Sequence, residues 1–220
     1  MTVTTRRERR QQQRRQQQRR SSGGGGGSGS RGLGQLWVAL GIVVVLVALV
    51  LVGRASGVFD APAQTKTDVN AVDVSGAKIG EHRDNTGNAH IPTGQKASYA
   101  SLPPTSGEHY AAPAGPVPWG IKTTFIPFEA TTHNLEHGGI VIMYNGLDKT
   151  QVDQLTSLVR SLNSSGFNKI VLEPWPDMKD AKIILTAWDW VLKLQAPDDA
   201  SVVKFVRQHT DDEAPENGTP

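Results

Sequence analysis

The stretch Gly139-Ile-Val-Ile-Met-Tyr144 decides how the back half of this chain folds. It is a continuous apolar run rich in β-branched residues, which predicts an interior strand. Asp148, with Gln151 three residues later, has the pattern of a capping box and predicts a helix start. Apolar residues then recur at helical spacing as far as Leu162, and Gly166 lies just past the predicted helix end. The sequence therefore predicts a buried strand followed by an amphipathic helix.

Two more extended regions and a second helix follow in the sequence. Lys169–Leu172 predicts a strand, and Ala181–Leu194 is an extended region whose apolar residues change parity near Ala187. Because a strand keeps one parity on each face, this change predicts a bulge or a break into two strands. Asp198 or Asp199 can cap a short final helix. The order strand–helix–strand–strand–helix indicates an α+β domain with one sheet and two helices on it.

The segment before this regular half is rich in residues that end helices and strands. Residues 79–129 contain seven Pro and six Gly, which predict short extended pieces and turns. We therefore expect one domain over residues 79–212, with a loop-rich Pro/Gly/His front half. Roughly 130 residues are enough to bury a sizeable core. Residues 213–220 are predicted to be a disordered tail.

A long apolar segment lies closer to the N-terminus. From Leu33 to Gly53 the sequence has no charged side chain. A bilayer core about 30 Å thick needs roughly 20 helical residues, so residues 33–53 predict a single transmembrane helix. A buried core helix is rarely apolar on all sides over such a length. A cleaved signal peptide is the main alternative, and the small residues Ala55-Ser56-Gly57 leave cleavage open. However, more than thirty residues precede the apolar run, which is unusually long for the N-terminal region of a signal peptide.

The distribution of charge predicts the orientation of this helix. Nine Arg precede it within residues 1–31, whereas Arg54 is the only basic residue close behind it. The positive-inside rule then places the N-terminus in the cytoplasm and the C-terminal domain outside the cell membrane. Residues 1–54 hold ten Arg and Glu8, so residues 55–220 hold 23 − 10 = 13 basic and 21 − 1 = 20 acidic side chains.

The remaining segments have the composition of connecting chain. Residues 1–32, rich in Arg, Gln and Gly, are predicted to be a disordered cytoplasmic tail, and residues 54–78 a linker. The Arg run is accounted for as the determinant of the orientation of the neighbouring transmembrane helix. We therefore expect the membrane as a partner and do not expect nucleic acid. The sequence has no Cys, which excludes disulfides, Cys-ligated metal sites and a thiol nucleophile.

The histidines are the residues with the clearest chemical potential. His133-Asn-Leu-Glu-His137 places two imidazoles at i and i+4, where one helical turn would direct both toward a shared metal ion. His109 ends a rigid Pro/Gly turn, His90 precedes another, and Met143 offers a thioether. Imidazoles without Cys suit zinc or copper, and a nearby Met favours copper. We predict His109, His133 and His137 as ligands, with His90 and Met143 as auxiliary ligands.

Two other interpretations remain open. In the first, the histidines bind loop backbone and brace the front half, and the domain is an accessory module that docks on an envelope protein complex. In the second, His133, Glu136 and His137 form an inverted zinc-protease motif with Glu136 as general base. That chemistry needs a long helix, which Pro127 and the pair Gly138-Gly139 argue against. An enzyme is therefore the less favoured expectation.

Three motifs together resemble a known family. They are His90-Ile-Pro-Thr-Gly94, Leu102-Pro-Pro-Thr-Ser-Gly-Glu-His109 and His133-Asn-Leu-Glu-His-Gly138. They are similar to an uncharacterised bacterial domain of unknown function whose members are commonly single-pass membrane-anchored proteins, and the similarity covers about residues 79–210. The resemblance implies an extracytoplasmic domain and a recurring set made of four histidines and Glu136, but no established activity. Glu108 departs from the family, which more often has Pro there.

Overall fold

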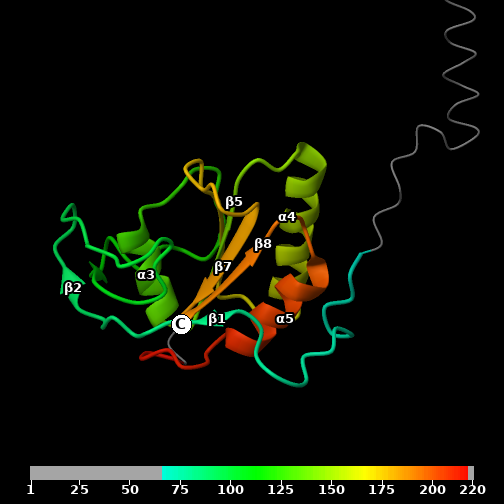
Figure 1. The fold of residues 1–220 in the computed structure, drawn as a ribbon, viewed down its shortest axis with the longest axis horizontal. Coiled ribbons are helices and arrows are strands. Elements are labelled where there is room, and N and C mark those ends of the chain that lie inside the picture. Colours follow the sequence, from blue (N-terminus) through cyan, green and yellow to red (C-terminus); the bar gives the residue numbers. More distant parts are fainter. Residues whose placement is uncertain (1–65, 218–220) are drawn as a thin grey trace, which may run out of the picture. The chain divides into compact units, whose positions relative to one another are not determined.

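The computed structural model describes residues 66–217, which form a mixed sheet with helices on both faces (Figure 1). The six-stranded sheet has the order β1-β8-β7-β5-β6-β4, and β2 and β3 form a separate two-stranded sheet. The strands are β1 (Glu81–His82), β2 (His90–Ile91), β3 (His109–Tyr110), β4 (Gly120–Ile121), β5 (Ile140–Tyr144), β6 (Ile170–Pro174), β7 (Ile183–Ala187) and β8 (Trp190–Leu194). The helices are α3 (Phe128–Glu136), α4 (Lys149–Ser164) and α5 (Asp199–His209).

The predicted interior strand is β5, at the centre of the sheet. It pairs in parallel with β6, with Ile140 opposite Ile170, and antiparallel with β7, with Met143 opposite Ile184. The predicted order strand–helix–strand–strand–helix is confirmed as β5, α4, β6, β7–β8 and α5. The change of parity near Ala187 marks a break between two strands, because β7 and β8 form a hairpin through a two-residue turn.

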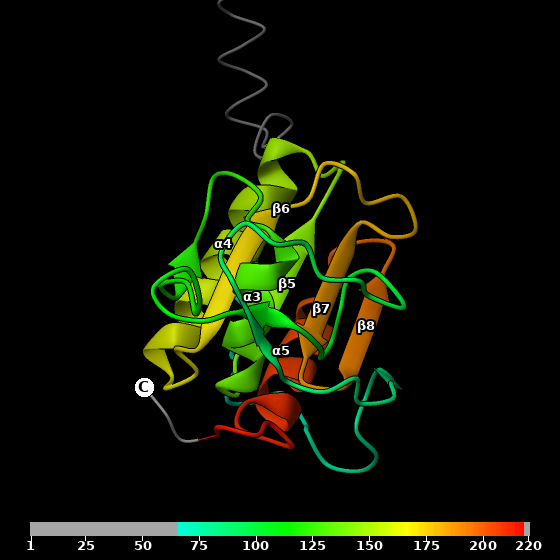
Figure 2. The same ribbon diagram turned by 90° about the vertical axis from the view of Figure 1, so that its left-hand side faces the viewer.

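Each face of the sheet carries its own hydrophobic core. Alternate residues of β5 point to opposite faces. Ile140 and Ile142 belong to a cluster with apolar residues of α4 and α5, whereas Val141 and Met143 belong to a cluster that includes Leu135 of α3. Figure 1 shows α3 on one side of the strands and α4 and α5 on the other, and Figure 2 shows the neighbouring strands in the order β6, β5, β7 and β8.

Helix α3 was not fully predicted from the sequence. We expected two helices on the sheet and only a turn around His133, but nine residues form a third helix. Pro127 does not block this helix, because it stands immediately before the first helical residue, where the fixed backbone of proline is tolerated. The helix is buried from Glu129 to Glu136, since loops of the front half cover the side that faces away from the sheet.

The start of α4 confirms the predicted capping box. The Asp148 carboxylate accepts a hydrogen bond of 2.9 Å from the Gln151 backbone N–H. The Gln151 side-chain oxygen accepts one of 3.0 Å from the Asp148 backbone N–H. Two backbone donors that the first helical turn leaves free are thereby satisfied.

The described segments at both ends pack on the domain. Residues 66–78 belong to the predicted linker, yet Val69 is buried and the Arg207 guanidinium of α5 donates to the backbone oxygens of Val69 and Val72, at 3.1 and 2.9 Å. Ala214, in the predicted C-terminal tail, is also buried. Within residues 66–217 no helix is both long and apolar enough to cross a membrane. The predicted N-terminal tail and the predicted span at residues 33–53 lie outside the described residues.

Candidate metal centre

The two-stranded sheet brings the first two histidines together. Strands β2 and β3 are parallel, and their register places His90 directly opposite His109. Partner residues in a parallel pair project to the same face, and the two ring centroids are 4.8 Å apart. His90 and His109 are 19 residues apart in the chain, so strand pairing brings their imidazoles together without a helical i, i+4 spacing.

Helix α3 adds a third imidazole and a carboxylate. The ring of His133 lies 4.9 Å from the rings of both His90 and His109, measured between centroids. Glu136, one helical turn further on, projects to the same side. Its side chain is 1% exposed and that of His109 is fully buried, so the two groups meet in the interior of the domain.

Four ligand atoms converge at this point. The Glu136 Oε2 atom lies 2.9 Å from the Nε2 of His109, 3.7 Å from that of His90 and 3.8 Å from that of His133. All four side chains offer ligand atoms within 4.8 Å of one another. In a tetrahedral zinc site with bonds of 2.0–2.1 Å, neighbouring ligand atoms are about 3.4 Å apart. The arrangement therefore has the dimensions of a metal site with three nitrogen ligands and one oxygen ligand.

Hydrogen bonds from the far side of two rings fix which nitrogen can bind a metal. The Nδ1 of His109 lies 2.8 Å from the Gly107 carbonyl oxygen, and the Nδ1 of His133 lies 2.6 Å from that of Tyr110. A carbonyl oxygen only accepts, so each Nδ1 carries the proton. In the neutral rings the Nε2 then presents a lone pair, toward Glu136 from His109 and toward the Nε2 of His137 from His133. Metal-ligating histidines typically have this kind of backbone support.

The contact between His109 and Glu136 requires a proton or a metal ion between the two atoms. A neutral His109 with its proton on Nδ1 would direct an Nε2 lone pair at a carboxylate oxygen 2.9 Å away, with almost no solvent to screen the repulsion. Either a proton or a metal ion at Nε2 removes this conflict. The second oxygen of Glu136 accepts a hydrogen bond of 2.9 Å from the Asn88 side-chain amide, which fixes the orientation of the carboxylate.

The surroundings keep His133 in its metal-binding form. Burial lowers the pKa of His133, and the neighbouring His109 and His137 rings lower it further, against the opposing effects of the Tyr110 carbonyl and Glu136. A lowered pKa keeps the imidazole neutral at neutral pH. The neutral ring is the form that binds metal ions.

His137 lies beside this group and belongs to a second one. Its Nε2 is 3.1 Å from the Nε2 of His133, in agreement with their i, i+4 spacing. It is also 3.2 Å from the Glu216 carboxylate, and His137, Glu136 and Glu216 form another set of ligand atoms within 4.8 Å of one another. The structure thus joins His90, His109 and His133 around Glu136 and places His137 at their edge.

Met143 occupies a different environment. It is 1% exposed and packs in the hydrophobic cluster between the sheet and α3, with Val171 and Trp175 among its members. Its role as an auxiliary ligand stays a prediction, whereas the convergent group consists of imidazoles and a carboxylate. The His90 side chain is 45% exposed, so the group opens to solvent on that side.

Sequence reasoning assigned Glu136 a different part and did not identify two further residues. Glu136 was considered as a general base and, through the family resemblance, as one of a recurring set of residues, but not as a metal ligand, yet it lies among the imidazoles as a potential ligand. Its position three residues after His133 is the signal that could have suggested this. Asn88 and Glu216 reach Glu136 and His137 from distant loops, and nothing in their local sequence distinguishes them.

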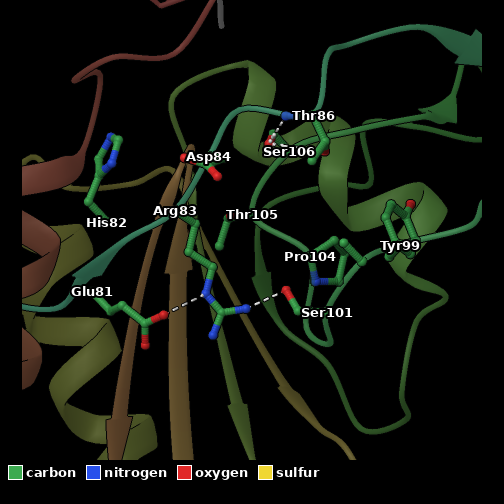
Figure 3. A pocket seen from close by; sticks show the side chains of 11 residues that line it. Glu81, His82, Arg83, Asp84, Thr86, Tyr99, Ser101, Pro104, Thr105 and Ser106 are labelled. Carbon is green, nitrogen blue, oxygen red and sulfur yellow. Dashed lines mark hydrogen bonds and ion pairs between the residues drawn. The ribbon is translucent and has the colours of Figure 1, made fainter.

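A pocket of about 560 Å³ is formed by residues between Glu81 and Ser106 (Figure 3). Thr105 and Ser106, from the Pro/Gly turn that leads to His109, line one side of it. Arg83 lines another side, where its guanidinium is paired with the Glu81 carboxylate and donates to the Ser101 hydroxyl. None of the residues that line this pocket belongs to the histidine group.

Comparison with known proteins places the chain in a family. Residues 90–220 match the model of the family described as "Protein of unknown function (DUF3105)". The chain belongs to this family. The match covers the convergent histidines and Glu136, so the candidate centre lies within the DUF3105 domain. Neither a curated protein nor a solved structure matches the chain, and the description of the DUF3105 family assigns no activity.

Proposed function

We propose that the DUF3105 domain of this protein is a transition-metal-binding module, anchored to the cell membrane and exposed on its outer face. The observation that carries the metal part is the convergence of His90, His109, His133 and Glu136 within 4.8 Å, with the Nδ1 atoms of two rings held by carbonyl oxygens. The apolar segment at residues 33–53 and the Arg excess before it support the anchor and its orientation.

The ligand set favours zinc or divalent copper. Three imidazole nitrogens and one carboxylate oxygen suit both ions, whereas monovalent copper prefers sulfur ligands. The sequence alone favoured copper because of Met143, but the proposed set is composed of nitrogen and oxygen. Zinc would adopt a tetrahedral geometry and copper a tetragonal one with the same residues.

A binding titration with a variant of one ligand tests this proposal. The purified full-length chain, kept in a mild detergent because residues 33–53 are apolar, is stripped with a chelator and titrated with Zn²⁺ or Cu²⁺ by calorimetry. Wild type is expected to bind the ion tightly, and His109→Ala to lose most of this affinity. His82→Ala is the matched control, because His82 is an exposed imidazole outside the group.

Thermal denaturation gives an independent measure. A ligand present at 100 times its dissociation constant stabilises the folded state by about 2.7 kcal/mol, which corresponds to roughly 5–10 °C in a domain of this size. The same gain is expected for His82→Ala and not for His109→Ala. Unchanged melting of the wild type with either metal would show that the histidines only brace the front loops, as in the accessory-domain interpretation.

A further inference from the structure

A second group of ligands adjoins the first. His137, Glu136 and Glu216 offer ligand atoms within 4.8 Å of one another, and the His137 Nε2 lies 3.2 Å from a Glu216 carboxylate oxygen. His137 follows directly after α3, and Glu216 comes from the C-terminal segment, 80 residues beyond Glu136. The second group is therefore assembled by tertiary structure and not by one acidic stretch of sequence.

Backbone hydrogen bonds hold the C-terminal segment in this position. The Glu216 N–H donates to the Glu136 carbonyl oxygen at 3.0 Å, and the Asp211 N–H donates to the Gly138 carbonyl oxygen at 2.9 Å. Lys169 donates to the His137 carbonyl oxygen at 3.1 Å and to the Asp211 carboxylate at 2.8 Å. The backbone of Glu216 is thus fixed at the end of α3 by bonds that do not involve its carboxylate.

Glu136 is common to both groups. A carboxylate has two oxygens and about four lone-pair positions, so it can bind two cations at once. The groups also meet where the Nε2 atoms of His133 and His137 lie 3.1 Å apart. Pairs of metal ions that share ligands in this way are typically 3.5–4 Å apart in proteins.

We infer that Glu136 bridges two metal ions. One ion is bound by His90, His109 and His133, and the other by His137 and Glu216. This inference rests on the proposed function, because it takes the first ion as bound. The second ion has three protein ligands and a Glu216 side chain that is 48% exposed, so it has room for water in its coordination sphere.

The experiment combines stoichiometry with electron paramagnetic resonance of the full-length chain titrated with Cu²⁺. Wild type is expected to bind two ions per chain. The resonance intensity is expected to rise with the first equivalent and then fall short of doubling with the second, because a bridging carboxylate couples the two unpaired spins. Glu216→Gln is expected to bind a single ion with an uncoupled spectrum. Glu213→Gln, a change in the same segment at a carboxylate paired with Lys78, should keep both ions.

The outcomes separate this inference from the proposed function. Binding of one ion by wild type and by Glu216→Gln alike would overturn the second site and leave the first intact. Two uncoupled ions would overturn the bridge. Two ions in Glu216→Gln would show that the second ion lies elsewhere. Binding of none would overturn both the inference and the proposed function.

Discussion

Replacing Glu173 by glutamine is expected to remove a large part of the pH dependence of stability. Glu173 lies on β6, is fully buried, and accepts a hydrogen bond of 2.7 Å from the Ile126 N–H, while its second oxygen has no hydrogen-bond partner within residues 66–217. Burial raises its pKa to about 7, against the smaller opposing effects of the Ile126 hydrogen bond and the Lys122 charge. The side chain is therefore protonated in the folded protein over a range in which the unfolded chain is ionised.

The size and sign of the effect follow from this difference. Between an ordinary pKa of 4.5 and the raised value of about 7, the folded state binds a proton that the unfolded state has released. The free energy of unfolding then falls as the pH rises, with the full contribution present below about pH 4.5 and lost by about pH 7. At 1.36 kcal/mol for each pH unit, the loss is roughly 3 kcal/mol.

Urea denaturation at pH 5 and pH 8, followed by tryptophan fluorescence, measures this loss. Glu173→Gln is neutral at both values, so its free energy of unfolding should fall by about 2.5 kcal/mol less than that of wild type between them, because pH 5 already lies above the ordinary pKa of 4.5. Glu81→Gln changes a carboxyl that is 68% exposed and should retain the wild-type profile. An equal loss in wild type and Glu173→Gln would refute the assignment of a buried neutral carboxyl.

Three further substitutions test how the front half and the helices are held. Gly139→Ala places a Cβ 2.4 Å from the Trp119 ring, so urea denaturation should show a loss of about 1–3 kcal/mol; no loss would contradict the close packing. Asn134→Ala removes hydrogen bonds to both the N–H and the carbonyl oxygen of Val117, and a loss of about 2–4 kcal/mol is expected in the same assay. Asp148→Ala should cost about 1 kcal/mol in thermal unfolding without changing metal binding.

Local sequence was sufficient for the regular half of the domain. The β-branched run of β5, the capping box of α4 and the parity change before β8 each arise from interactions between near neighbours in the chain. These patterns depend on backbone preference and on which face of an element is buried. For this reason the order of strands and helices from β5 to α5 was predicted correctly.

The front half could not be predicted in the same way, because long-range contacts determine it. The parallel pairing of β2 with β3 sets His90 against His109, and loop residues cover a helix whose own composition is polar. The proximity of His133 and His137 was predicted from their spacing. The contributions of Asn88 and Glu216 depend on loop paths for which the sequence has no periodic signal.

X-ray absorption at the metal edge tests the central claim most directly. The full-length chain loaded with one equivalent of Zn²⁺ should give a first coordination shell of nitrogen and oxygen atoms at about 2.0–2.1 Å, with the outer-shell scattering of three imidazole rings. His109→Ala should lose one imidazole contribution, and His82→Ala should leave the spectrum unchanged. A spectrum of the hydrated ion, or one that is identical in wild type and His109→Ala, would contradict the claim that these histidines and Glu136 form a metal centre.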